Sequence, residues 1–330
     1  MNTTPSSAPN PSSTTDHDRE GSDQDHPQVD ATQRTPAAGK LALVLGGGGS
    51  AGNAWLIGVI AGLHDAGLDV TDADLIIGTS AGSTAAAQIT SATPTALLAS
   101  ILAEVPQPRP APIRSDAGHV PIRPADQLER TNKIIAAAED AADMRRRIGA
   151  AAIELDAGAD GSWQTRWRAT VGARLPSQHW PQRAVRVVAV DAHTGAPVVF
   201  DRNSGVDLVD AVAASCSSGV AYRIGDDRYI DGGYRRSSEN ADLAAGYERV
   251  LVLSPLGGRT RMPLEWDMQL AVQVEELRAG GSTVETILPD GSSRDAFGSN
   301  LMDPTRRPPA ARAGYDQGKA AAEQLTDFWR

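Results

Sequence analysis

The sequence is short of cysteine and of long apolar runs. Its 330 residues include one cysteine, Cys216, which excludes an internal disulfide and a metal site built from several cysteines. No Cys-His signature surrounds Cys216, so we expect a small buried side chain. No apolar run approaches the ~18–20 residues that cross a bilayer, and the start lacks the basic stretch and apolar core of a signal peptide. We therefore expect a cytoplasmic protein.

Basic charge is also scarce. The chain has 31 Lys and Arg against 41 Asp and Glu, a net charge of −10. Proteins that bind nucleic acid neutralise phosphates with basic groups, so we expect no nucleic-acid partner. Adhesion to an anionic membrane by charge alone is excluded for the same reason.

Composition divides the chain into two parts. Residues 1–39 are rich in Ser, Thr, Pro, Asp and Gln, and we expect a disordered acidic tail that solubilises the protein or docks a partner. Residues 40–330 form one expected domain, with a helical insert at about 94–181. Trp163 and Trp167 lie four residues apart in this insert, which either covers a site or uses both side chains to fill a core.

The expected domain opens with alternating strands and helices. Lys40–Leu45 is an apolar run typical of a buried strand, and the glycine-rich segment Gly46–Gly52 follows it. Apolar residues then recur every three to four positions, which predicts a helix over Asn53–Ala66. A second apolar strand, Asp74–Ile77, comes next. This βαβ order predicts an α/β fold with a mostly parallel sheet.

The second strand ends in a turn that suits a serine nucleophile. Gly78, Ser80 and Gly82 form a Gly-x-Ser-x-Gly pattern, and a helix is expected from Ala81 onward. Where a strand turns directly into a helix, the residue in the middle of the turn takes a strained backbone conformation. Glycines on either side of it lack the Cβ atoms that would clash. The pattern predicts that the Ser80 side chain projects alone at the sheet edge.

The glycine-rich segment has two competing interpretations. Gly47-x-Gly49-x-x-Gly52 matches a dinucleotide fingerprint, but bare amides here could equally form an oxyanion hole for an acyl-transfer serine. A dinucleotide site needs an acid at the carboxyl end of the second strand. The nearby acids precede or open that strand, as Asp74 does, and its end carries Ser80. This favours the oxyanion hole and leaves a dinucleotide-binding oxidoreductase as the alternative.

Ser80 needs a base to take its proton. No histidine follows Asp231, which ends a short strand before two glycines, so the Ser, Asp, His order of α/β-hydrolases cannot use Asp231. His179 or His193 with an earlier acid stays open, and a dyad of Ser80 and Asp231 is the economical alternative. The histidines are His17, His26, His64, His119, His179 and His193.

Together these motifs resemble the patatin-like phospholipase family. The glycine-rich block Gly46–Gly52, the turn Gly78–Gly82 and the Asp-Gly-Gly of Asp231–Gly233 match in order, as do Asp191–Gly195 and Ala213–Cys216. The resemblance implies a three-layer fold with a mostly parallel central sheet and helices on both faces. It also implies a serine acyl hydrolase that acts on lipid or other esters and makes transient contact with a membrane surface.

The resemblance assigns roles to individual residues. It implies that Ser80 is the nucleophile, that Asp231 is the base, and that the backbone amides of Gly47, Gly48 and Gly49 form the oxyanion hole. No metal or other cofactor is required. If water is excluded, the same site would transfer the acyl group to an alcohol.

Two departures from the family pattern bear on substrate choice. Ser50 and Ala51 stand where the family usually has an arginine before the last glycine, and Ser217–Ala221 stands where prolines are usual. The first change alters the surroundings of the oxyanion, and the second reshapes the acyl pocket. They also favour the second alternative, a catalytically quiet lipid-binding or regulatory protein.

Overall fold

The computed structural model describes residues 39–104, 124–157 and 161–330. The expected acidic tail lies outside these residues except for Gly39, which already belongs to the first strand, β1 (Gly39–Leu45). In the ranges described, none of the helices is both long enough and apolar enough to span a membrane.

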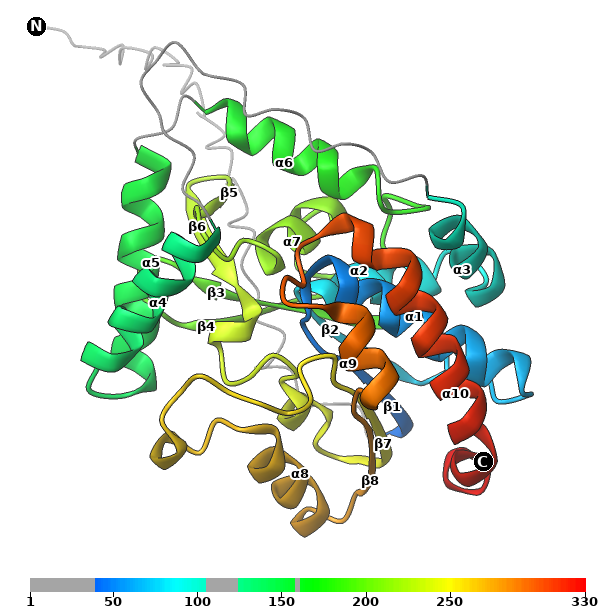
Figure 1. Ribbon diagram of the computed structural model, residues 1–330. Helices are drawn as coiled ribbons and strands as arrows, with labels where there is room; N and C mark the ends of the chain where they lie inside the picture. The colour runs from blue at the N-terminus through cyan, green and yellow to red at the C-terminus, as the bar shows by residue number, and fades with distance from the viewer. Residues whose placement is uncertain (1–38, 105–123, 158–160) are drawn as a thin grey trace, which may run out of the picture.

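One mixed sheet of eight strands forms the centre of the molecule (Figure 1). Its path runs β5-β6-β3-β2-β1-β7-β8, with β4 paired to β3. Five neighbouring strands are parallel, as the βαβ pattern predicts, and their carboxyl ends share one edge. Besides β1 they are β2 (Leu75–Thr79), β3 (Ala184–Asp191), β7 (Tyr247–Leu253) and β8 (Thr283–Ile287).

Three short antiparallel strands extend the sheet beyond β3. They are β4 (Pro197–Phe200), β5 (Tyr222–Ile224) and β6 (Asp227–Asp231). Strand β3 lies parallel to β2, with Val188 opposite Thr79, and antiparallel to β6, with Ala189 opposite Asp231. This register carries the end of β6 to the edge of the sheet where β2 ends.

Helices cover both faces of the sheet, which confirms the predicted three layers. Alternate residues of β2 point to opposite faces: Ile76 joins the larger core, while Leu75 and Ile77 join a second core beneath α8 (Leu270–Ala279). The larger core packs against α1 (Gly49–Asp65), α2 (Ala81–Ile89), α3 (Pro94–Leu102), α6 (Ser162–Gly172), α7 (Leu208–Ser215), α9 (Gly291–Phe297) and α10 (Arg307–Trp329).

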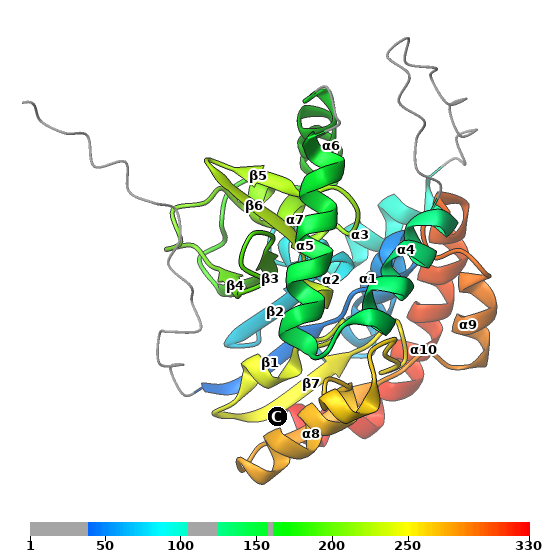
Figure 2. The same ribbon diagram turned by 90° about the vertical axis from the view of Figure 1, so that its left-hand side faces the viewer.

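A third core lies under two helices of the insert. α4 (Pro124–Ala137) and α5 (Ala141–Ala157) pack with Val190 of β3 and Ile230 of β6. The pair stands at the left in Figure 1 and toward the viewer in Figure 2. This core lies close to Asp231, one residue beyond Ile230.

Some helix boundaries differ from those expected. α1 begins at Gly49 rather than Asn53, so the last glycines of the glycine-rich segment belong to its first turn. The expected long helix at 125–156 is two helices, and the Asp140 carboxylate accepts the Asp143 amide at the start of the second. α8 begins at Leu270 rather than Glu265, because Asp267 adopts a left-handed backbone conformation after a short 3-10 turn.

Candidate active site

Ser80 occupies the turn between β2 and α2, as its motif predicts. Its backbone is strained, with φ 52° and ψ −117°, a conformation rare for a residue with a side chain. A Cβ on Gly78 would lie 2.5 Å from the Ser83 Cα, and one on Gly82 would lie 1.9 Å from the Leu45 carbonyl oxygen. Only glycine fits at both positions, so the close packing of the chain holds Ser80 in this geometry.

Asp231 ends β6, and the structure brings its carboxylate to Ser80. The Ser80 side chain lies close enough to this carboxylate for their interaction to lower the pKa of Asp231. The Gly233 amide donates a hydrogen bond to Asp231 Oδ1 at 2.8 Å, and the Asp231 amide donates to the Ser217 carbonyl at 2.9 Å. Ser80 and Asp231, which belong to two motifs far apart in the sequence, therefore meet in the fold, and the backbone of each is held in place.

The Asp231 carboxylate is buried, at 8% exposure. Burial raises its pKa from the ordinary 3.8 to about 6, because the charged form loses its hydration. The hydrogen bond from the Gly233 amide, the neighbouring Ser80 side chain and the positive charge of Arg261 oppose this rise. A carboxylate with a pKa of about 6 is a better proton acceptor at neutral pH than an ordinary aspartate.

The glycine-rich segment lies beside Ser80. A Cβ on Gly47 would be 3.4 Å from the Ser80 Cβ. The Gly47 amide, however, donates to the Ser238 carbonyl at 2.8 Å, which differs from its expected role as a free donor. For the amides of Gly48 and Gly49 the described part of the chain shows no acceptor. These two amides open α1, where the helix dipole is positive.

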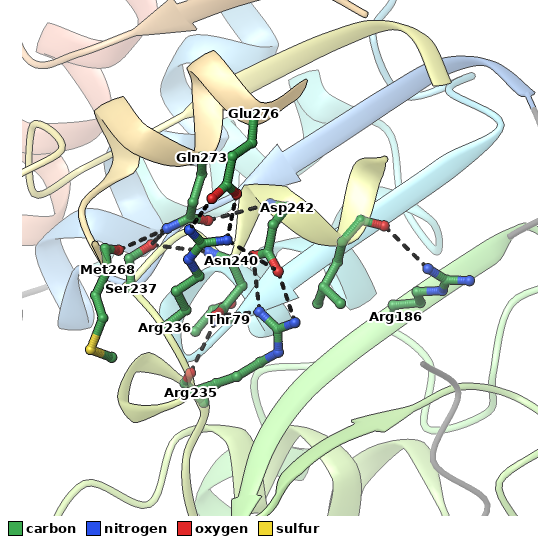
Figure 3. A network of polar contacts seen from close by, with 12 residues as sticks. Thr79, Arg186, Arg235, Arg236, Ser237, Asn240, Asp242, Met268, Gln273 and Glu276 are labelled. Carbon is green, nitrogen blue, oxygen red and sulfur yellow. Dashed lines mark hydrogen bonds and ion pairs between the residues drawn. The ribbon is translucent and has the colours of Figure 1, made fainter. Parts of the chain in front are cut away.

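Sequence reasoning missed Asn240, which links the backbones on both sides of the pair. Its Nδ2 donates to Thr79 Oγ1 and to the Gly232 carbonyl, both at 3.0 Å. Thr79 precedes Ser80, and Gly232 follows Asp231. Asn240 is fully buried and has φ 54°, a conformation that Asn tolerates better than most residues. Figure 3 shows Asn240 and Thr79 within the surrounding network of polar contacts. The residue type of Asn240 is the only signal that the sequence offers.

Glu239, also missed, anchors the neighbouring loop. It is 1% exposed, and its carboxylate accepts hydrogen bonds from three serine hydroxyls. Ser237 donates at 2.8 Å, and Ser238 and Ser254 each donate at 2.6 Å. Because the Ser238 carbonyl holds the Gly47 amide, this cluster positions the glycine-rich segment.

An arginine stands near the place where the family arginine is absent. Arg307, at the start of α10, donates from Nη1 to the Ser50 carbonyl and to Asn53 Oδ1, both at 3.1 Å. Its Nε pairs with Glu104 at 2.8 Å. The guanidinium therefore ties α10 to the first turn of α1, close to the amides of Gly48 and Gly49.

The other candidate side chains, which are Cys216, the two tryptophans and the histidines of the described ranges, take no part in the site. Burial raises the pKa of the Cys216 thiol to about 11, which keeps it protonated and a poor nucleophile. Trp163 and Trp167 stack with ring centroids 6.2 Å apart against the larger core, as the core-filling interpretation predicts. Among the histidines in described ranges, none hydrogen-bonds to Ser80 or Asp231; His17, His26 and His119 lie outside those ranges.

Part of the helical insert approaches the site. The α4 residue Gln127 donates to the Ser218 carbonyl at 3.3 Å, next to the Ser217 carbonyl that holds Asp231. Ser217–Ala221 is the segment in which the expected prolines are missing, so α4 and this segment together border the Asp231 side of the site. Across the described ranges, no three His, Cys, Asp or Glu side chains come together as a metal would need.

Comparison with known proteins identifies the family. The model of the patatin-like phospholipase family matches residues 43–245, more than half of the chain. VipD from Legionella pneumophila is similar in structure, with 12% identity, a TM-score of 0.39, and coverage of 88% of this chain and 67% of VipD. The type III effector protein ExoU has 16% identity and a TM-score of 0.37 over 88% of this chain, which spans about half (54%) of the ExoU chain.

Among curated proteins the comparison finds no match. The family model spans all three motifs, from the glycine-rich segment through Ser80 to Asp231, and membership supports a lipid hydrolase activity. The chain belongs to the patatin-like phospholipase family.

Proposed function

We propose that this protein is a serine acyl hydrolase that acts on lipid or other carboxylic esters through a dyad of Ser80 and Asp231. The observation that carries the proposal is the close approach of the Ser80 side chain, on a strained strand-to-helix turn, to the buried Asp231 carboxylate. A serine hydroxyl is activated when it lies next to a general base, and the raised pKa of Asp231 makes this carboxylate a better base.

The reaction follows from these contacts. Asp231 accepts the Ser80 proton as Oγ attacks the ester carbonyl, and the protonated carboxyl then gives this proton to the leaving alcohol. The acyl group remains on Ser80 until a water molecule, losing its proton to Asp231, releases the carboxylic acid. Attack by an alcohol in place of water would transfer the acyl group.

Both tetrahedral intermediates carry a negative oxygen beside Ser80. We assign its stabilisation to the amides of Gly48 and Gly49 and to the amino-terminal dipole of α1, because the Gly47 amide is held by Ser238. Each donor of this kind contributes about 3–4 kcal/mol in other serine enzymes. Arg307 holds the turn that carries these amides.

The direct test is labelling with a fluorophosphonate probe beside hydrolysis of p-nitrophenyl esters of graded chain length. The proposal predicts covalent labelling and turnover, and the chain-length preference reports the depth of the acyl site. A protein that binds lipid but neither labels nor hydrolyses any ester would be the catalytically quiet alternative.

Activity should depend on pH through Asp231. The carboxylate must be ionised to accept the proton, and its pKa is about 6. We therefore expect kcat/KM to fall tenfold per pH unit below about pH 6 and to level off above it. The measurement is initial-rate kinetics with a p-nitrophenyl ester between about pH 4.5 and 8. A profile that stays level down to about pH 4.5 would contradict a base with a raised pKa.

Asn240 should affect turnover without contacting the substrate. Replacing Asn240 with aspartate keeps the shape but removes the two donors to Thr79 and Gly232. We expect kcat to fall between about tenfold and 100-fold, because small displacements of reacting groups are costly. Asn203→Asp is the matched control, since Asn203 is exposed and its backbone amide, which donates to Asp201 Oδ1 at 2.8 Å, is kept. Equal kcat values for the Asn240 variant and the wild type would show that the link does not position the dyad.

A further inference from the structure

A cavity lies apart from the dyad. It has a volume of about 310 Å³ and opens between the start of α5, the start of β4 and the loop at Trp266. Three arginines face it: Arg145 of α5, and Arg235 and Arg236, which follow the Asp-Gly-Gly turn. Pro197 and Trp266 supply an apolar wall, and Asp267 is the one acid among the lining residues. The volume is at the small end of ligand sites, which run from about 300 to 1,000 Å³.

Two of these arginines are fixed by acids. The Arg235 guanidinium pairs with both carboxylate oxygens of Asp242, each at 2.9 Å. The Arg236 guanidinium pairs with Glu276 at 2.6 and 2.7 Å (Figure 3). Two-point pairs of this kind fix the plane and position of a guanidinium. The wall of the cavity is therefore built before any ligand arrives.

The third arginine has no such partner. Arg145 donates to the carbonyls of Gly195 at 2.8 Å and Arg235 at 3.0 Å, and within the described ranges no carboxylate forms an ion pair with it. Burial and the adjacent charge of Arg235 lower the pKa of the Arg145 guanidinium, and Asp140 opposes this only at a distance. A half-buried cation beside another cation is unfavourable unless an anion compensates it.

Arg235 is also incompletely satisfied. Its Nε is buried and has no hydrogen-bond acceptor in the described part of the chain. This N–H is buried behind the cavity wall, so the guanidinium open to a ligand without a carboxylate partner is that of Arg145. Asp267, the one acid among the lining residues, forms no ion pair with Arg145 within the described ranges, so a bound anion would supply the negative charge that Arg145 lacks.

We propose that this cavity binds a small organic phosphate, with the phosphate group at Arg145 and the organic part against Trp266 and Pro197. Guanidinium groups match phosphate oxygens in geometry and charge, and an aromatic wall suits an apolar substituent. The phosphate belongs either to a soluble ester or to a lipid head group. Neither Ser80 nor Asp231 lines this cavity, so binding does not depend on the proposed hydrolysis.

The test measures binding in the Ser80→Ala background, so that no ester is consumed. Isothermal titration calorimetry with phenyl phosphate should show one site. Arg145→Gln should weaken this binding at least about tenfold, because it removes a charge-assisted contact. Arg146→Gln is the matched control: Arg146 is the next residue on α5, is half exposed, and pairs with Asp143 at 3.6 Å. It should leave the affinity within about twofold, since Arg146 does not line the cavity.

A second variant keeps the test valid if Arg145→Gln does not fold. Trp266→Ala should weaken the binding of phenyl phosphate several-fold and leave the binding of inorganic phosphate unchanged, because only phenyl phosphate has a ring that contacts Trp266. Vesicles of phosphatidylcholine with and without phosphatidic acid separate the two sources. Binding that needs phosphatidic acid and Arg145 assigns a lipid head group, and binding of phenyl phosphate alone assigns a soluble ester. Absence of both, or equal losses for Arg145→Gln and Arg146→Gln, would overturn the proposal.

Discussion

Replacing Ser80 with alanine is expected to abolish fluorophosphonate labelling and to lower ester hydrolysis by at least about 1,000-fold. The reason is that no acyl-enzyme can form without the hydroxyl that lies beside the Asp231 carboxylate. Stability should change little, because the Ser80 amide, which donates to Ser215 at 2.9 Å, is kept. The measurement is labelling and p-nitrophenyl ester kinetics beside a thermal melt. Ser91→Ala, a serine in the turn that follows α2, should retain full labelling and activity.

Asp231→Asn tests the other half of the dyad and separates loss of the base from loss of the fold. The folded-state pKa of Asp231, about 6, lies above its ordinary 3.8, so the folded state binds more protons between these pH values. Stability therefore falls as pH rises through this window, by up to about 3 kcal/mol above it. The neutral amide removes this cost, so Asp231→Asn should be inactive yet melt higher than wild type at pH 8. An active Asp231→Asn variant, or label on Ser80→Ala, would refute the dyad.

The sequence predicted the parts of the site that depend on local chain geometry. A strand that ends in Gly-x-Ser-x-Gly before a helix can place Ser80 in few ways, whereas Asp231 was assigned through the resemblance of its Asp-Gly-Gly to the family motif. The boundaries of α1 and α8 were wrong because they depend on single backbone conformations. Gly48 caps α1 and Gly49 begins it, ahead of the expected start. The left-handed conformation of Asp267 delays the start of α8.

The supporting contacts could not be predicted because they join residues far apart in the chain. Asn240 reaches Thr79 across 161 positions, and Arg307 reaches Ser50 across 257. The hydrogen bond from the Gly47 amide to the Ser238 carbonyl depends on a loop that lies almost 200 residues later in the chain. Spacing and composition carry no information on such pairs, which appear only when the strands are placed in register.

Gly82→Ala should have the largest effect on stability of any change at the site. The added Cβ would lie 1.9 Å from the Leu45 carbonyl oxygen and 2.9 Å from that of Gly46, and a backbone oxygen cannot rotate away as a side chain can. α2 must therefore move away from the end of β1, which also displaces the glycine-rich segment from Ser80. We expect the free energy of unfolding to fall by roughly 3 kcal/mol or more, measured by urea denaturation.

The matched control for this change is Gly291→Ala, at the first position of α9, where an added Cβ meets nothing within 4 Å. It should be neutral or slightly stabilising, because alanine restricts the unfolded chain more than glycine does. Activity should be lost as well: Gly82→Ala should not hydrolyse esters even at temperatures where it remains folded, since the displaced glycine-rich segment carries the amides of Gly48 and Gly49 away from Ser80. A Gly82→Ala protein with wild-type stability and turnover would show that α2 and β1 are not packed as closely as the Ser80 turn requires.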